Sequence, residues 1–160
     1  MDQTTQMPDK QYIFGSLLII ANRMDTLLER ELRQFGVTSK QWFLSVIIDS
    51  LFAEPPTMKE VAREMGSSHQ NVKQVALKLQ EKNLLTLVKD KKDRRVTRIR
   101  MTNESQEFWK KTQPKGTIFT EALFEGIKKE DLQLARQVMQ KIMNNLEHME
   151  KGNDEEADIE

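Results

Sequence analysis

Apolar positions recur every three or four residues along much of the chain, which predicts a mainly helical fold. Residues 11–35 form the first such stretch, and the glycine directly after it supplies a helix stop signal. Residues 39–52 follow as a second helix, which begins at a Thr38 or Ser39 cap and ends before Pro55. This second helix is apolar on most sides. We therefore expect it to lie at the buried centre of the fold.

Two shorter helices come next, separated by a turn. Thr57 caps the first of them, and a glutamate three positions later completes the spacing of a capping box. Gly66 ends this helix, and Ser67 or Ser68 caps the next one, which covers residues 69–82. Two short helices joined by a turn with glycine, the second rich in outward polar groups, are typical of a helix-turn-helix.

A β-hairpin is predicted directly after this motif. Asn83 stands where a left-handed residue would close the preceding helix. The segments 84–90 and 95–102 then carry the apolar pattern of two strands around a polar turn without glycine. A hairpin in this position is a wing, so we assign residues 37–102 to a winged helix-turn-helix domain.

After Thr102 the pattern becomes helical again. Pro114 and Gly116 predict a kink or break in the first helical segment. A final helix over residues 130–149 carries an apolar stripe of Leu132, Ala135, Val138, Met139, Ile142, Leu146 and Met149. The winged unit is too small to cover these faces. We therefore predict a mainly α fold with a small β-hairpin, in which residues 1–36 and 103–150 form N- and C-terminal dimerisation helices.

Charge is segregated along the chain although the formal net charge is zero. Residues 89–100 hold seven basic and two acidic side chains, whereas residues 150–160 hold six acidic side chains and one lysine. A local basic patch matters more for nucleic-acid binding than the total charge does. The acidic segment has almost nothing to bury, so we expect residues 151–160 to be a disordered tail.

The second helix of the helix-turn-helix offers polar groups suited to base and phosphate contacts. Glutamine and asparagine can make paired hydrogen bonds to adenine, and lysine can reach guanine or phosphate. The candidates are Ser67, Ser68, His69, Gln70, Asn71, Lys73, Gln74 and Lys78. Candidate DNA-backbone contacts are Thr38, Ser39, Thr57 and Lys59. Any amphipathic helix has a polar outer face, however, so this helix alone does not decide between DNA reading and an ordinary surface.

The turn of the hairpin favours the DNA-binding interpretation. It brings together Lys91, Lys92, Arg94 and Arg95 with Asp93 among them. Crowded cations repel one another unless an anion relieves them, and a narrow minor groove is such an anion. The aspartate can hold one guanidinium by a paired contact and orient it. The alternative is a solvated charged turn.

The wing resembles the DxR…LT signature of the MarR family of winged-helix regulators. Asp93, Arg94 and Arg95 are followed after five residues by Met101 and Thr102, with methionine in the place of leucine. The order of predicted elements is also that of the family.

The resemblance covers residues 11–149 and implies a homodimer that binds a pseudopalindromic operator in double-stranded DNA. It implies that Arg95 enters the minor groove, oriented by Asp93, with Arg94 beside it on phosphate. Many members of the family are repressors released by small aromatic ligands bound between the DNA-binding and dimerisation regions. Others sense peroxide through cysteine, and this chain has no cysteine. We therefore expect a dimeric transcriptional regulator that acts as a repressor and is released by a small aromatic ligand.

Other classes of protein find less support in the sequence. The chain has no cysteine, phosphate loop or nucleophile elbow, and its two histidines, His69 and His148, fall in different modules. We expect no enzymatic activity, cofactor or metal. Trp42 and Trp109 either line a ligand pocket or belong to the core. The alternatives to a regulator of transcription are a winged-helix protein-interaction module and a sensor whose ligand dominates its physiology.

The chain is also expected to be a soluble cytoplasmic protein. No apolar run approaches the roughly 20 residues of a membrane span. The first ten residues lack the basic and then apolar layout of a signal peptide. We therefore expect no membrane partner.

Overall fold

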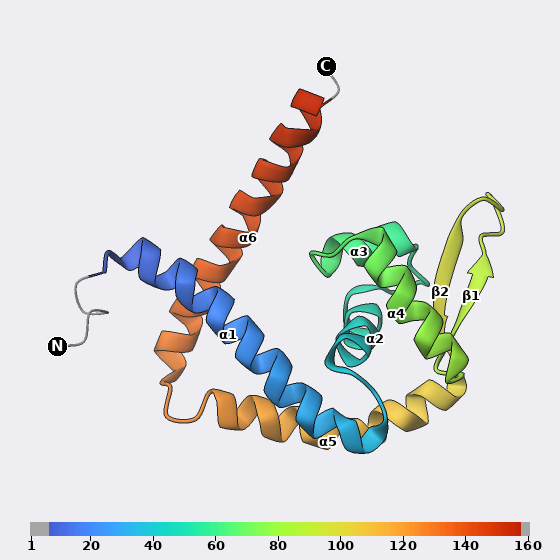
Figure 1. The fold of residues 1–160 in the computed structure, drawn as a ribbon, viewed down its shortest axis with the longest axis horizontal. Helices are drawn as coiled ribbons and strands as arrows, with labels where there is room; N and C mark the ends of the chain where they lie inside the picture. Colours follow the sequence, from blue (N-terminus) through green and yellow to red (C-terminus); the bar gives the residue numbers. More distant parts are fainter. Residues whose placement is uncertain (1–6, 158–160) are drawn as a thin grey trace. The chain divides into compact units, whose positions relative to one another are not determined.

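The computed structural model describes residues 7–157, with side chains described as far as residue 150. Its elements are α1 (Asp9–Leu32), η2 (Arg33–Phe35), α2 (Ser39–Leu51), α3 (Met58–Glu64), α4 (His69–Glu81), β1 (Leu85–Lys89), β2 (Thr97–Met101), α5 (Asn103–Leu123) and α6 (Lys129–Ala157) (Figure 1). The chain divides into two compact units, residues 1–119 and residues 120–160. The predicted mainly α fold with one small hairpin is confirmed.

Residues with hydroxyl side chains cap the N-terminal ends of α2, α3 and α4. The Thr38 hydroxyl accepts a hydrogen bond from the backbone N–H of Gln41, and the Gln41 side chain accepts one from the N–H of Thr38. Thr57 and Glu60 form the same reciprocal pair at the start of α3, as predicted. Ser68 caps α4. The structure thus selects Thr38 and Ser68 where the sequence left two candidates at each position.

Left-handed residues follow η2, α3 and α4. Gly36 has a φ of 67° after η2, and Gly66 has a φ of 57° after α3. Asn83 has a φ of 58° after α4, so the predicted closing role of this asparagine is confirmed. These residues turn the chain sharply enough for short helices to pack on one another.

The core of the first unit is formed where α2, α3, α4 and the hairpin meet. Its buried members are Leu32, Val37, Leu44, Ile47, Ile48, Met58, Val61, Ala62, Val72, Ala76, Leu79, Leu84, Leu85 and Ile99. Trp42 and Trp109 pack against this cluster, which supports their core interpretation. Helix α2 contacts α1, α3 and α4. It is nevertheless less enclosed than predicted, because Phe43 and Leu51 are exposed.

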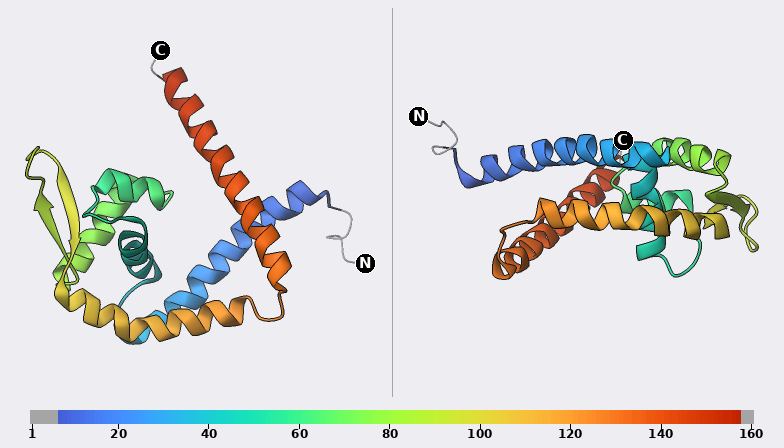
Figure 2. Two further views of the ribbon diagram at one scale, coloured as in Figure 1. Left: turned by 180° about the vertical axis from the view of Figure 1, so that it is seen from behind. Right: turned by 90° about the horizontal axis from the view of Figure 1, so that it is seen from below.

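The wing is an antiparallel hairpin that lies beside α4 (Figure 1, Figure 2). Leu85 pairs with Met101, and Leu87 pairs with Ile99. The alternation of a strand therefore places these four apolar side chains on one face of the hairpin. The backbone N–H of Ile99 also donates to the carbonyl of Pro56 at 2.8 Å. This bond attaches β2 to the segment that precedes α3.

Helix α5 continues through Pro114, so the predicted break is wrong. A proline removes one backbone donor from a helix, but packing can hold the neighbouring turns together. Gly116 is buried here against α2, and a Cβ atom on it would lie 3.2 Å from Cζ2 of Trp42. The sequence predicts that this glycine interrupts the helix. In the structure it lets α5 approach the indole ring.

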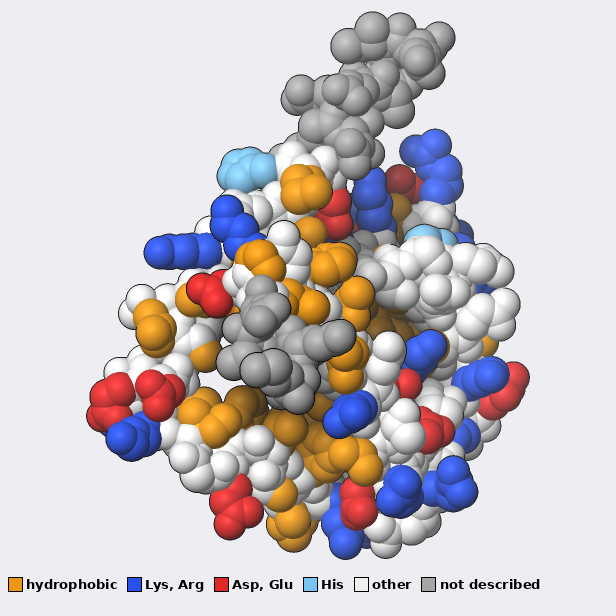
Figure 3. Space-filling view, turned by 60° about the vertical axis from the view of Figure 1, so that its left-hand side comes forward, with side chains coloured by type: hydrophobic (Ala, Val, Ile, Leu, Met, Phe, Trp, Pro, Cys, Tyr) orange, Lys and Arg blue, Asp and Glu red, His pale blue; other side chains and the backbone are white. Residues whose placement is uncertain are grey.

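The terminal helices carry apolar side chains at the surface (Figure 3). In the first unit these are Tyr12, Ile13, Phe14, Leu18, Ile19, Ile20, Leu27 and Ile118. In the second unit they are Leu123, Leu134, Val138, Met139, Met143, Leu146 and Met149, and Phe124 and Ile127 are exposed in the turn between α5 and α6. Helix α6 extends to Ala157 and so includes most of the acidic segment for which disorder is predicted. Residues 158–160 of that segment lie outside the described residues.

Candidate nucleic-acid interface

Helix α4 has one buried face and one open polar face. Val72, Ala76 and Leu79 are buried in the core. The exposed candidates named from the sequence are Ser68, His69, Gln70, Asn71, Lys73, Gln74 and Lys78, whereas Ser67 is half-buried. In the described part of the chain, the side chains of Gln70, Lys73 and Gln74 make no hydrogen bond or ion pair. Their donors and acceptors are therefore available to a ligand.

The tip of the wing holds the aspartate–arginine pair that the sequence suggested. Asp93 accepts hydrogen bonds from the backbone N–H of Arg95 at 3.0 Å and from its Nε at 3.2 Å. A second oxygen of Asp93 lies 3.5 Å from Nη2 of Arg95. The Arg95 side chain is nevertheless 92% exposed. The carboxylate thus orients the guanidinium while leaving its outer edge open to solvent.

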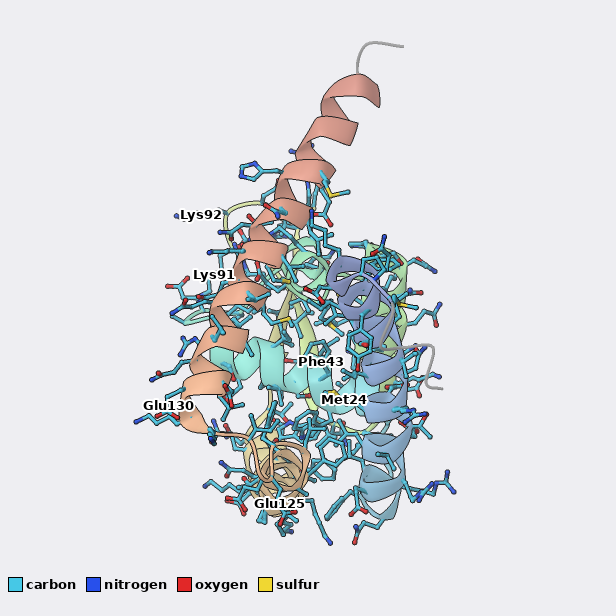
Figure 4. The ribbon with its side chains drawn as sticks, turned by 90° about the vertical axis from the view of Figure 1, so that its left-hand side faces the viewer. Met24, Phe43, Lys91, Lys92, Glu125 and Glu130 are labelled. Atoms are coloured by element: carbon cyan, nitrogen blue, oxygen red, sulfur yellow. The ribbon has the colours of Figure 1, made fainter. Side chains whose placement is uncertain are left out.

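The remaining cations of the turn are free of such contacts. Lys91, Lys92 and Arg94 are exposed, and Figure 4 labels the two lysines. Among the described residues none of their side chains forms an ion pair. The turn therefore presents concentrated positive charge in which Arg95 has a defined orientation.

A second acidic residue, Asp90, organises the base of the turn. It accepts hydrogen bonds from the backbone N–H groups of Lys92 at 2.8 Å and Asp93 at 3.0 Å, and from Nε of Arg98. Arg98 also donates from Nη1 to the carbonyl of Pro55 at 2.9 Å. The hydrogen bond from Arg98, followed by those from the two backbone N–H groups, lowers the pKa of Asp90 to about 2. The pKa of Arg98 is raised in return, chiefly by Asp90.

This arrangement was not predicted, because in the sequence Arg98 is only one of the basic residues at 89–100. The register of the hairpin would have indicated the Asp90–Arg98 pair. Lys89 pairs with Thr97, so Asp90 and Arg98 flank the last pair of the ladder. Opposite charges at neighbouring positions of paired strands commonly interact.

The four candidate DNA-backbone residues differ in what they can offer. Lys59 is exposed and unpaired within the described residues. Thr38 and Thr57 use their hydroxyl oxygens as helix caps. The structure does not leave Ser39 free for this role, because it is only 5% exposed.

Carboxylates from α1 already occupy the polar groups of Ser39. Its backbone N–H donates to Glu29 at 2.6 Å, and its hydroxyl donates to Asp25. A phosphate at this point would replace one of these carboxylates or face both. Asp25 and Glu29 therefore already supply the negative charge that stabilises the N-terminal end of α2.

A pocket of ≈ 280 Å³ adjoins these residues. It is lined by Asp25, Glu29, Thr38, Ser39, Lys40, Gln41, Gln74, Val75 and Lys78. Pockets that bind aromatic molecules are usually lined by apolar and aromatic side chains, and this one is not. No group of three or more potential metal ligands occurs in the described residues. The described helices include none that is long and apolar enough to cross a membrane.

Together, a capped helix-turn-helix, a hairpin beside its second helix and long flanking helices define a winged-helix protein. Comparison of the sequence with protein-family models and with curated proteins gives no match. Comparison of the structure gives many. The chain has the fold of MarR-family transcriptional regulators.

Three solved structures illustrate the likeness. A MarR/EmrR family regulator from Acinetobacter sp. ADP1 superposes with a TM-score of 0.79 at 17% identity, over 89% of this chain and 99% of that one. AbsC, a MarR family regulator from Streptomyces coelicolor, gives 0.78 at 19% identity, over 89% and 97%. CouR from Rhodococcus jostii RHA1, bound to p-coumaroyl-CoA, gives 0.74 at 19% identity, over 89% and 96%. The match thus includes both the winged unit and the terminal helices.

Proposed function

We propose that this chain is a MarR-family transcriptional regulator that binds double-stranded DNA in a sequence-specific manner and acts as a cytoplasmic repressor. The observation that carries the proposal is the Asp93–Arg95 pair on an exposed turn. An ordinary surface turn gains nothing from several adjacent cations. A turn that enters a minor groove gains both from its positive charge and from an arginine that is held in one orientation before binding.

Helix α4 supplies the second part of the proposed interface. Its open face offers Gln70, Asn71 and Gln74 for base edges and lysines for phosphate or guanine. A winged-helix domain can place such a helix in the major groove while the wing reaches the adjacent minor groove. In this arrangement α4 supplies most of the preference for particular bases, and Arg95 supplies most of the preference for a narrow minor groove.

We further propose that the regulator is a homodimer joined through its terminal helices. The apolar side chains exposed on α1 and α6 would otherwise remain in water, at a cost that grows with their area. A twofold dimer binds two half-sites related by symmetry. The operator should therefore be a pseudopalindrome with half-site centres about 10 base pairs apart or a multiple of that spacing.

Selection of bound sequences from random double-stranded DNA tests the DNA-binding proposal directly. We expect a pseudopalindrome to be enriched, and its affinity to fall by roughly 0.9 log unit per tenfold rise in salt for each phosphate neutralised. A matched selection with the Arg95→Ala variant should recover the same half-sites with weaker enrichment. If the wild-type protein enriches no sequence, the chain is instead a winged-helix interaction module.

We also propose that a small aromatic ligand releases the protein from DNA. The support is the structural likeness to CouR, whose structure holds an aromatic thioester. No aromatic side chain lines the pocket beside Ser39, so we propose that the ligand binds elsewhere. Thermal-shift screening with aromatic acids and phenols tests the proposal, because a ligand that prefers the native state raises the melting temperature. Hits must also weaken operator binding to support release.

A further inference from the structure

One apolar side chain lies on the open polar face of α4. Leu77 is 37% exposed, whereas the inward Val72, Ala76 and Leu79 are almost completely buried. Leu77 follows Gln70 by seven residues and Gln74 by three, so an α-helix aligns all three in one row. This row lies opposite the core-facing row. Leu77 therefore shares the surface that the glutamines occupy and is not a member of the buried core cluster.

The spacing of this row matches the way a helix reads a major groove. The recognition helix of homeodomains places base-contacting side chains at positions i, i+3, i+4 and i+7. In α4 these positions are Gln70, Lys73, Gln74 and Leu77. Seven residues of helix advance by about 10 Å, which corresponds to roughly three base pairs. Leu77 can therefore lie in the same groove as the two glutamines.

The major groove offers one chemically matching partner for a leucine. Base edges there present hydrogen-bond donors and acceptors, and the only apolar group among them is the 5-methyl of thymine. Lysines flank the row, because Lys73 lies toward one side and Lys78 toward the other. They can contact the phosphates of the two groove walls and centre the row over the base edges.

We propose that Leu77 is a specificity-determining residue that recognises a thymine methyl group in each operator half-site. This inference rests on the proposed DNA-binding function and adds to it one required base. The methyl group and the leucine side chain bury each other from water, and a polar base edge at that position leaves its donor or acceptor unpaired against leucine. Leucine at this position therefore favours thymine and also disfavours the other bases.

Replacement of thymine by deoxyuridine tests the contact because it removes only the methyl group. The operator is the sequence enriched in the selection from random DNA. In each test duplex, one thymine is replaced at the equivalent position of both half-sites. Affinity for each duplex is measured by fluorescence anisotropy at one fixed salt concentration. For the wild-type protein we expect replacement at one position to weaken binding by about fourfold for each half-site. This is the factor that corresponds to the loss of one buried methyl group.

The Leu77→Ala variant should bind the unmodified operator more weakly and should no longer distinguish thymine from deoxyuridine at that one position. Gln80→Ala, at an exposed position of the same helix, is the matched control and should keep the wild-type discrimination. Circular dichroism checks that both variants are folded.

Two results would overturn the inference while leaving the DNA-binding proposal intact. One is a wild-type protein that binds every deoxyuridine duplex as tightly as the unmodified operator. The other is a Leu77→Ala variant that keeps the full preference for thymine. A protein that binds no DNA at all fails earlier, at the selection step, and overturns the proposed function together with this inference.

Discussion

Arg98 donates from Nε to Asp90 at the base of the wing and from Nη1 to the carbonyl of Pro55, which lies 43 residues earlier in the chain. One guanidinium therefore joins the hairpin turn to the segment before α3. The fork of donors on arginine permits this double contact, and a lysine cannot reproduce it. Together with the backbone bond from Ile99 to Pro56, this link holds the wing against the helix-turn-helix.

Replacement of Arg98 should weaken DNA binding without removing a DNA contact. We expect Arg98→Met and Arg98→Lys both to lower operator affinity, because either change frees the wing from Pro55. The salt dependence of binding should stay near the wild-type value, since each phosphate contact contributes about 0.9 to the slope. Anisotropy titrations over a range of salt concentrations measure both quantities. A slope reduced by about one unit in Arg98→Met would show instead that Arg98 contacts phosphate.

The lowered pKa of Asp90 predicts a pH dependence of stability. Its pKa is about 2 in the folded protein against a usual value of 3.8. A lowered pKa stabilises the fold fully above the usual value, and this contribution is lost as the pH falls toward 2. Urea unfolding at several pH values between about 5 and 2 should show a smaller acid loss in Asp90→Asn than in the wild type. Equal losses in the two proteins would contradict this role.

Arg95 should contribute to binding and not to assembly. We expect Arg95→Ala to weaken operator binding by about 1–3 kcal/mol while the dimer persists. Asp93→Asn keeps the arginine but removes the charge that orients it, so its loss should be smaller. Anisotropy and analytical ultracentrifugation measure the two properties separately. Wild-type affinity in Arg95→Ala would exclude the proposed contact of the wing with DNA.

Thr102 should stabilise the junction between the wing and α5. Its hydroxyl donates to the carbonyl of Asn83 at 2.7 Å and accepts from the N–H of Ser105 at 3.1 Å. We expect Thr102→Val to lower the free energy of unfolding by about 1 kcal/mol, which is typical for loss of a helix cap. Thr102→Ser retains the hydroxyl and is the control. Chemical denaturation should show a larger loss of stability for Thr102→Val than for Thr102→Ser. Similar losses in both variants would show that the side chain acts through packing and not through its hydrogen bonds.

Gly116 should tolerate no large side chain. We expect Gly116→Leu to destabilise the protein by about 1–3 kcal/mol through overpacking against Trp42. Thr117→Leu places the same side chain at the adjacent exposed position of α5 and should have little effect. Thermal and urea unfolding measure the difference. If Gly116→Leu is as stable as the control, the close approach of α5 to Trp42 does not constrain the fold.

The parts of the fold that local interactions determine were predictable from the sequence. Thr57 and Glu60 are three positions apart, and the cap they form needs no other segment. Asn83 likewise ends α4 through its own backbone conformation. The pairing of Asp93 with Arg95 spans two residues and was predictable for the same reason.

Features that depend on contacts between distant segments were not predictable in this way. Pro114 predicted a break in α5, but the packing of Gly116 on Trp42 involves a helix far earlier in the chain. Ser39 resembled a free phosphate ligand until α1 placed Asp25 and Glu29 against it. Arg98 resembled its basic neighbours, although its partners include Pro55. In each case the side chain has an ordinary local preference that tertiary packing overrides.

The bonds of Thr102 have a mechanical consequence. One oxygen atom holds the residue that follows α4 and also the first turn of α5. The end of the proposed reading helix and the start of α5 are therefore bonded to the same hydroxyl group. A change in the direction of α5 must either tilt α4 or break these bonds. A movement at the start of α5 is therefore coupled to the helix that would lie on the bases.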